Sequence, residues 1–197
     1  MDVTIFRFPD HTKAYIYLII DNFSRAVLNW KVSSELKASI SFENIREVFD
    51  RYGLHHLADV VELIVDDGSK NKKEVDAFVN LADSNVKKLV AQVDIVQSNS
   101  MVEAANKILK HQYLFPKDIQ NLKQLCDGIA FYQEDFNNRP QGDLYGLNPL
   151  EVLSTGTLPH KSRFKEQIIT ARRKRVEQNQ KFDCAKCPNP TESDTGN

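Results

Sequence analysis

Three β-forming runs crowd into the first 33 residues, and this feature limits the possible folds more than any other. Residues 2–8 alternate apolar and polar side chains, residues 14–20 are almost continuously apolar, and residues 25–33 are again rich in β-formers. The stretches between these runs are too short to hold a helix, so the strands must reverse direction through turns. The sequence therefore predicts an antiparallel meander of three strands, with the middle strand buried on both faces.

Beyond the meander, the apolar positions switch between helix spacing and strand spacing. Strands are predicted at residues 60–65 and 89–96, and helices at residues 41–52, 72–82, 99–115, 119–137 and 148–153. Ser39 or Ser41 is the expected N-cap of the first helix and Asp118 that of the fourth, while Gly53 ends the first. Three strands followed by alternating helices and strands predict an α/β fold, with one mixed five-stranded sheet flanked by helices.

The length of 197 residues predicts one domain with an appendage: a core at residues 1–155, a basic helical extension at 156–182 and a disordered tail at 183–197. Charge is distributed unevenly between these parts. Residues 1–160 hold 17 basic and 22 acidic residues, whereas residues 161–197 hold 9 basic and 5 acidic ones. The run Arg172, Arg173, Lys174 and Arg175 is compatible either with contacts to nucleic-acid phosphates or with a solvated helix.

The cysteines and the apolar runs bear on the compartment. Three cysteines, an odd number, favour a reducing environment. Cys184 and Cys187 have the spacing of zinc ligands, but no second pair accompanies them, so no zinc site is predicted. The longest apolar run, residues 14–20, is too short to span a bilayer. These features together predict a cytoplasmic protein.

One predicted helix carries an unusual polar face. On a helical wheel, Met101, Val102, Ala105, Ile108, Leu109 and Tyr113 gather on one side, and Asn99, Glu103, Asn106, Lys107 and Lys110 on the other. A helix that buries the first group presents a single carboxylate, Glu103, among amides and ammonium groups. This face is either a solvated surface with a Glu103–Lys107 ion pair or part of a functional site.

Two further carboxylates stand at comparable places in the predicted fold. Asp2 lies on the first strand and Asp66 directly after the fourth, so the two converge if those strands are neighbours, and the helix could bring Glu103 over them. Oxygen ligands of this kind suit Mg²⁺, and two such ions about 4 Å apart promote phosphoryl transfer. On position alone, Asp10, Asp21 and Asp67 are equally acceptable ligands.

Short motifs in a fixed order narrow this choice. They are Asp2-Val-Thr4, Asp21-Asn-Phe-Ser-Arg25, Asp66-Asp-Gly-Ser69, Asn99 with Glu103 and Lys110, and Asn138-Arg139-Pro140. Between Asp66 and Glu103 there are 36 residues. In these motifs and their spacing, residues 2–153 resemble the catalytic core of DDE-type insertion-sequence transposases and retroviral integrases, which have a ribonuclease H-like fold.

The resemblance implies specific roles for these residues. Asp2, Asp66 and Glu103 would be the catalytic triad and would bind two Mg²⁺ or Mn²⁺ ions, and Asp21 would close a turn. DNA contacts are expected from Asn99, Lys107, Lys110, Arg139, Arg172, Arg173, Lys174 and Arg175. The expected partners are the DNA of element ends and target and further copies of the chain, in a bacterial, nucleoid-associated setting, with no membrane and no small-molecule substrate.

The implied function is metal-dependent phosphodiester hydrolysis followed by DNA strand transfer. Two alternatives remain open: a catalytically inactive fragment or regulator that binds DNA or full-length transposase, and a structure-specific or RNA–DNA hybrid nuclease with the same fold. The sequence departs from the family pattern at Asp67, where asparagine is usual, and at Gln141, where histidine is usual. Because no helix-turn-helix precedes the core, sequence-specific DNA binding is not expected of this chain alone.

Overall fold

The computed structural model describes residues 1–68, 74–80, 85–91, 93–94, 99–158 and 164–181. The chain divides into two compact units, Met1–Thr157 and Leu158–Asn197. The predicted disordered tail at 183–197 and the pair Cys184 and Cys187 lie outside the described residues.

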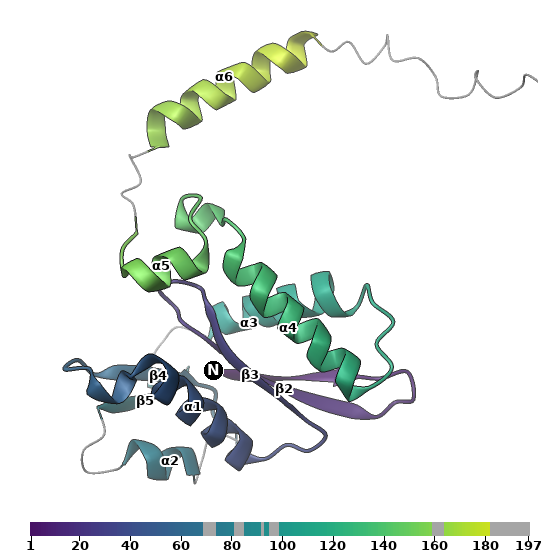
Figure 1. Cartoon of the computed structure of the whole chain (residues 1–197), viewed down its shortest axis with the longest axis vertical. Helices are drawn as coiled ribbons and strands as arrows, with labels where there is room; N and C mark the ends of the chain where they lie inside the picture. The colour runs from purple at the N-terminus through teal and green to yellow at the C-terminus, as the bar shows by residue number, and fades with distance from the viewer. Residues whose placement is uncertain (69–73, 81–84, 92, 95–98, 159–163, 182–197) are drawn as a thin grey trace, which may run out of the picture. The chain divides into compact units, whose positions relative to one another are not determined.

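The predicted meander is confirmed (Figure 1). β1 (Asp2–Arg7), β2 (Lys13–Ile20) and β3 (Val27–Ser33) form an antiparallel sheet in the order β1-β2-β3. Asp2 pairs with Leu18 across the first ladder, and Leu18 pairs with Trp30 across the second. The apolar run of β2 is buried along most of its length, as its composition predicts.

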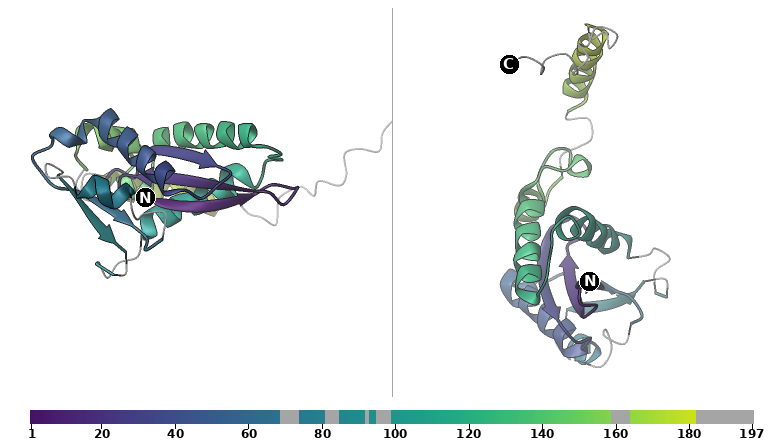
Figure 2. Two further views of the ribbon diagram at one scale, coloured as in Figure 1. Left: turned by 90° about the horizontal axis from the view of Figure 1, so that it is seen from below. Right: turned by 90° about the vertical axis from the view of Figure 1, so that its right-hand side faces the viewer.

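The remaining strands form a separate pair. β4 (Val61–Val65) and β5 (Val86–Val90) run parallel to each other. The strand predicted at residues 89–96 was placed too late, because Val86 and Leu89 are the buried residues of β5, and β5 pairs with β4 in that register. In Figures 1 and 2 this pair of strands lies next to the N-terminal end of β1. Among the described residues, the strand ladders are those of a three-stranded and a two-stranded sheet, so the mixed α/β class is confirmed and the single five-stranded sheet stays a prediction.

Helices cover both faces of the three-stranded sheet. α3 (Ser100–Ile108), its π-helical continuation η3 (Leu109–Leu114) and α4 (Leu122–Asn138) contribute to one core with Ile16, Leu18 and Val27. α1 (Ala38–Tyr52) contributes to a second core with Ile19 and Leu28, which also receives residues of β4, β5 and α2 (Glu74–Val79). Because side chains alternate along β2, they contribute to two cores, one on each face of the sheet.

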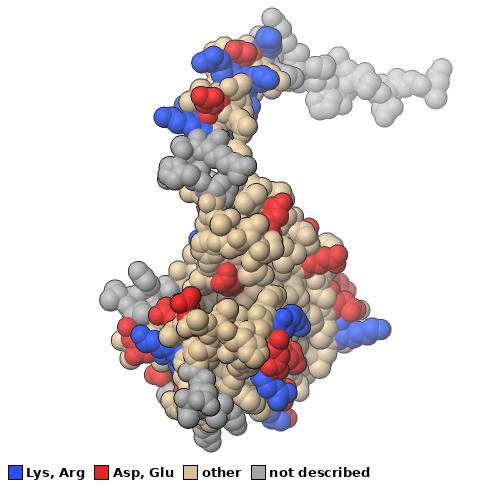
Figure 3. Space-filling view, turned by 60° about the vertical axis from the view of Figure 1, so that its left-hand side comes forward, with Lys and Arg blue, Asp and Glu red and all other residues tan. Residues whose placement is uncertain are grey.

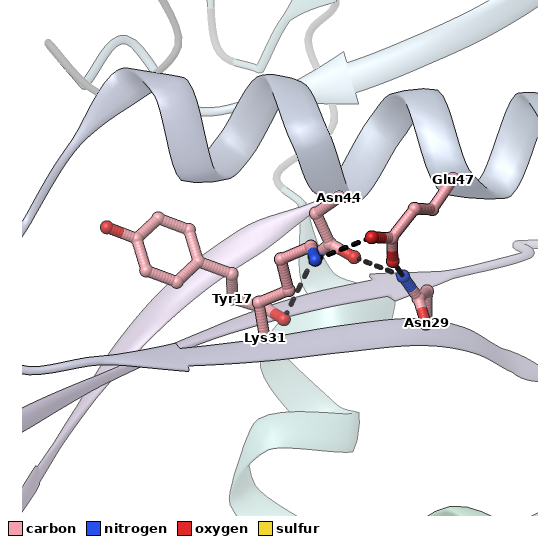
Figure 4. A network of polar contacts seen from close by, with 5 residues as sticks. All are labelled: Tyr17, Asn29, Lys31, Asn44 and Glu47. Carbon is pink, nitrogen blue, oxygen red and sulfur yellow. Dashed lines mark hydrogen bonds and ion pairs between the residues drawn. The ribbon is translucent and has the colours of Figure 1, made fainter.

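A buried polar network fixes α1 on its face (Figure 4). Asn44 is fully buried, and its Nδ2 donates to the carbonyl oxygen of Tyr17 at 3.1 Å. Asn29 Nδ2 donates to Asn44 Oδ1 and to Glu47 Oε2, both at 2.9 Å, and Lys31 Nζ pairs with Glu47 Oε1 at 2.7 Å. Buried amides that are bonded on both sides hold one register between helix and sheet, because a shift would leave them unpaired.

Several predicted helix starts were wrong. α1 begins at Ala38 with Lys37 in the N-cap position, so Ser41 lies inside the helix, where it is buried. α4 begins after Asn121 rather than Asp118, because the Asn121 side chain accepts the Gln124 N–H and so caps the helix. Gly53 does end α1, in a left-handed conformation at φ 61°.

The remaining elements are helical. η1 (Leu54–His56) and η4 (Gly142–Leu144) are short 3₁₀ helices in connections. At the end of the first unit, α5 (Pro149–Thr155) starts with a capping box between Asn148 and Glu151. α6 (Lys165–Lys181) has no buried residue. No helix in the described part of the chain has the length and apolar character needed to cross a membrane.

Candidate functional site

Asp2 is the first residue of β1, and hydrogen bonds from Val3 and Asn106 hold its carboxylate. The Val3 N–H donates to Oδ1 at 2.7 Å, and Asn106 Nδ2 donates to Oδ2 at 2.8 Å. Because Asp2 pairs with Leu18, its side chain lies on the sheet face that α3 covers. A half-buried carboxylate held in this way keeps a fixed orientation, and carboxylate oxygens are ligands that hard divalent cations prefer.

The other two predicted ligands lie on neighbouring segments. Asp66 directly follows β4 and is half-buried, and the Gly68 N–H approaches its Oδ1 at 3.4 Å. Glu103 lies on the exposed side of α3. The carboxylate that starts the turn after β2, Asp21, has the structural role predicted for it: its Oδ2 accepts the Ser24 N–H at 2.7 Å.

Three hydrogen bonds join the segments that carry the three carboxylates. The Met1 nitrogen donates to the Ile64 carbonyl oxygen at 2.7 Å, which links β1 to β4. Asn99 Nδ2 donates to the Met1 carbonyl oxygen at 2.9 Å, and Asn106 donates to Asp2, so both bonds link β1 to α3. The start of β1, the end of β4 and the first turns of α3 therefore meet at one place.

The segments meet, but their described side chains do not close into a metal site. Among the residues that the structure describes, no three His, Cys, Asp or Glu side chains lie close enough together to hold a metal ion. The donor set nevertheless fits a hard divalent cation, because three carboxylates on adjacent segments supply oxygen ligands and leave positions for water and phosphate.

Asn106 is the residue of this site that sequence reasoning missed. The helical wheel placed it on the solvent side, but it is only 5% exposed because its amide reaches Asp2. The available signal was its position one turn after Glu103, on the same polar side of the helix. Asn99, which the helical wheel also placed on the polar side, is buried as well: it occupies the N-cap position of α3 without a capping bond, and its amide donates to the Met1 carbonyl oxygen.

The predicted DNA-contacting cations lie in three different settings. Lys107 is exposed, whereas Lys110 is half-buried near Asp2. Burial lowers the pKa of Lys110, and the negative charge of Asp2 opposes that effect. Arg139 pairs with Asp135 at 2.5 Å and lies over the Tyr113 ring at 5.6 Å. The basic residues of α6 are all exposed, namely Arg172, Arg173, Lys174 and Arg175.

Comparison with solved structures identifies the fold. The catalytic core domain of HTLV-2 integrase in complex with magnesium superposes with a TM-score of 0.54 and 18% identity, over 77% of this chain and 91% of that one. The catalytic core domain of BIV integrase superposes with a TM-score of 0.57 and 18% identity, over 79% of this chain and 93% of that one. A chain of the simian T-cell lymphotropic virus intasome in complex with PP2A regulatory subunit B56 gamma superposes with a TM-score of 0.59 and 14% identity, over 82% of this chain and 56% of that one.

Sequence comparison adds no relative: no protein-family model and no curated protein matches the chain. The assignment therefore rests on the arrangement of strands and helices, which three solved structures share over more than three quarters of this chain. In its structure, this chain shares the fold of the integrase catalytic core domains of HTLV-2 and BIV.

Proposed function

We propose that this chain is the catalytic core of a DNA transposase or integrase, a polynucleotidyl transferase that hydrolyses phosphodiester bonds and transfers DNA strands. One observation carries the proposal: within an integrase-core fold, the segments bearing Asp2, Asp66 and Glu103 are joined by direct hydrogen bonds. The similar HTLV-2 core was solved with magnesium, which supports a divalent metal here.

In the proposed mechanism, Asp2, Asp66 and Glu103 would hold two Mg²⁺ or Mn²⁺ ions. When bound, such ions stabilise the attacking and leaving oxygens of a phosphoryl transfer. Asn106 and the Val3 N–H keep the Asp2 carboxylate oriented, so little of its freedom remains to be lost when a ligand binds. Lys107 and Lys110, one and two turns after Glu103, would bind the phosphates that flank the reacting one.

Duplex DNA is the proposed substrate, and an assembly of several copies is the proposed active form. The similar simian T-cell lymphotropic virus protein was solved as an intasome, which supports both proposals. Figure 3 shows Lys and Arg side chains outnumbering Asp and Glu on α6, and both signs of charge interspersed on the visible face of the first unit. Exposed basic side chains on a helix suit phosphate contacts that do not depend on sequence.

The second candidate function is a non-catalytic regulator that binds DNA or full-length transposase. The observation in its favour is that the described carboxylates do not form a closed metal site. Such a protein would keep the fold and the basic helix and would bind DNA without cutting it.

Nicking of supercoiled plasmid DNA in Mn²⁺ by the purified chain tests the first proposal. We expect Asp66→Asn and Glu103→Gln each to lower the nicking rate by at least about 100-fold, because each removes a charged metal ligand. Asp67→Asn is the matched control: it removes a neighbouring charge, restores the residue usual in the family, and should leave nicking intact.

The outcomes separate the two candidates. Equal nicking by wild type, Asp66→Asn and Glu103→Gln would indicate a contaminating nuclease and would refute the triad. DNA binding by the wild type without nicking in either Mg²⁺ or Mn²⁺ would favour the regulator.

A further inference from the structure

Arg25, which lies between β2 and β3, has a backbone conformation that is unfavourable for its residue type. Its φ is 66°, in the left-handed region, where a residue with a Cβ atom is strained. In the described part of the chain, the other non-glycine residues with a positive φ are His11 and Tyr145. Such strain persists only where the surrounding structure imposes it, and it is frequent at functional sites.

The turn that contains Arg25 is held by hydrogen bonds at both of its ends. The Asp21 N–H donates to the Ala26 oxygen, and the Arg25 N–H donates to the Asp21 oxygen, both at 2.9 Å. Asp21 Oδ2 accepts the Ser24 N–H at 2.7 Å. Ser24 is fully buried, and its Oγ accepts the Ala26 N–H at 3.2 Å. These bonds keep Arg25 in the strained conformation and fix the direction in which its side chain leaves the backbone.

The Arg25 side chain reaches the first turn of α3. Its guanidinium donates to the sulfur of Met101, which is the second residue of that helix. A thioether sulfur is a weak acceptor, and a guanidinium has five N–H donors. In the described part of the chain, no carboxylate and no carbonyl oxygen accepts a hydrogen bond from this group. The half-buried guanidinium therefore has donors left for an anion that offers several oxygens.

Further cations follow Arg25 along the same helix. Ile108 lies seven residues after Met101, which is about two helical turns, so the two residues share one side of α3. Ile108 and Arg139 line the same cavity, of about 320 Å³, and the exposed Lys107 directly precedes Ile108. A row of separate cations matches the repeated charge of a DNA backbone better than it matches a single carboxylate.

We propose that Arg25 binds a backbone phosphate of the DNA substrate, beside the helix that carries Glu103. This inference rests on the proposed function and names one of its substrate contacts. A guanidinium can bond one phosphate through two parallel N–H groups. Because the turn fixes the start of the side chain, less conformational freedom is lost when the phosphate binds. The strained backbone is then a stability cost that DNA binding explains.

Binding of a fluorescein-labelled DNA duplex to the full chain tests this contact, with EDTA present so that no metal contributes. We expect Arg25→Gly to weaken binding about tenfold at low salt, because one charged phosphate contact is lost. The slope of log K against log salt should fall by about 1 for the same reason. Arg25→Lys keeps the charge but not the paired donors, so it should keep the slope and lose only part of the affinity.

His11→Gly is the matched control, because His11 has a φ of 68°, is exposed and lies in the turn between β1 and β2. Both exchanges place glycine where the backbone is left-handed, and glycine adopts this conformation without strain. We expect neither exchange to lower the urea midpoint of unfolding, and only Arg25→Gly to weaken DNA binding. A lower midpoint in Arg25→Gly with unchanged DNA affinity would show that Arg25 only packs against Met101, and would overturn the proposal.

Nicking in Mn²⁺ at increasing DNA concentration separates binding from chemistry. Arg25→Gly should raise KM and change kcat little, because the proposed contact holds DNA in the ground state and in the transition state alike. High DNA concentration should therefore restore its nicking rate to near the wild-type value, whereas Asp66→Asn should stay slow at every DNA concentration. A low rate of Arg25→Gly at saturating DNA would overturn a role in binding alone.

The failure of this proposal can be told apart from the failure of the proposed function. Equal DNA affinity and equal salt slope in the wild type and Arg25→Gly would overturn the Arg25 contact alone, and the nicking test of Asp66 and Glu103 would stand. A wild type that does not bind the duplex would contradict both. If Arg25→Gly instead lowers the sedimenting mass and leaves DNA affinity unchanged, the acceptor belongs to a second copy of the chain, which would also overturn the phosphate contact.

Discussion

The sequence pattern places Asn106 on the solvent side of α3, but the residue is buried, and its amide is hydrogen-bonded to Asp2. The pattern counts Asn106 as polar and therefore as outward-facing, since an unpaired amide is costly to bury. The start of β1 supplies the missing acceptor, the Asp2 carboxylate, at 2.8 Å. The role of this residue could not be predicted from its own helix, because its partner lies 104 residues away in the chain.

The exchange Asn106→Ala tests this role. Removing the amide leaves the Asp2 carboxylate with one fewer donor, so we expect Mn²⁺ affinity to fall about 10- to 100-fold. Calorimetric titration with Mn²⁺ in the absence of DNA measures the change. Asn138→Ala, which removes an exposed amide bonded to the Glu134 oxygen, is the matched control and should bind Mn²⁺ like the wild type. Unchanged Mn²⁺ affinity in Asn106→Ala, together with lower stability, would assign Asn106 a purely structural role.

At the scale of elements, η3 and α4 are joined by one polar cluster. The Tyr113 hydroxyl of η3 donates to Asp135 of α4, and Arg139 pairs with the same carboxylate at 2.5 Å. The Tyr113 ring also packs edge-on against Tyr132, with centroids 4.9 Å apart. Burial, followed by the bond to Asp135, raises the pKa of Tyr113 from 10.0 to about 12. Burial also raises the pKa of Tyr132.

This shift predicts a loss of stability at alkaline pH. The folded-state pKa of Tyr113 lies above the unfolded value, so its stabilising effect is complete below about pH 10 and is lost as pH rises towards 12. Tyr113→Phe should cost about 1 kcal/mol of unfolding free energy at pH 8, through the lost hydrogen bond. Its deficit relative to the wild type should then shrink above pH 10. Urea unfolding of the wild type and Tyr113→Phe at pH 8, 10 and 11 measures the difference in unfolding free energy at each pH. A difference that stays constant with pH would contradict the raised pKa of Tyr113.

At the scale of the whole molecule, the chain consists of a first unit with two hydrophobic cores and a second unit with a basic helix. The first unit, Met1–Thr157, contains both hydrophobic cores, whereas α6 in the second unit buries no side chain. A 17-residue helix without packing is marginal by itself, so a bound partner would be needed to stabilise it fully.

A chain ending at Thr157 separates these contributions. We expect its melting temperature to match that of the full chain, because the removed unit packs no side chain of α6 into a core. Its affinity for DNA should depend less on salt: the slope of log K against log salt should fall by up to about 4 if Arg172, Arg173, Lys174 and Arg175 each contact a phosphate. Binding measured by fluorescence anisotropy at four salt concentrations gives the slope. An unchanged slope would show that α6 makes no phosphate contact.

The sequence by itself determined the local elements and the chemical type of the site. Strand alternation gave the meander, Gly53 ended α1, and the order of strands and helices indicated the class that the integrase cores confirm. These features depend on neighbouring residues, whose spacing can be read along the chain. The motifs also named Asp2, Asp66 and Glu103, and their assignment as ligands stays a prediction.

Only the tertiary structure decided how these segments meet. It turned Asn99 and Asn106 inward to bind the start of β1, started β5 at Val86, and joined the start of β1 to β4 through Met1 and Ile64. Each outcome depends on a partner from a distant part of the chain, and a buried polar group is stable only where that partner exists. The spacing of residues along the chain does not show which distant residues become partners. The sequence therefore predicted the residues of the site, and the fold determined their arrangement.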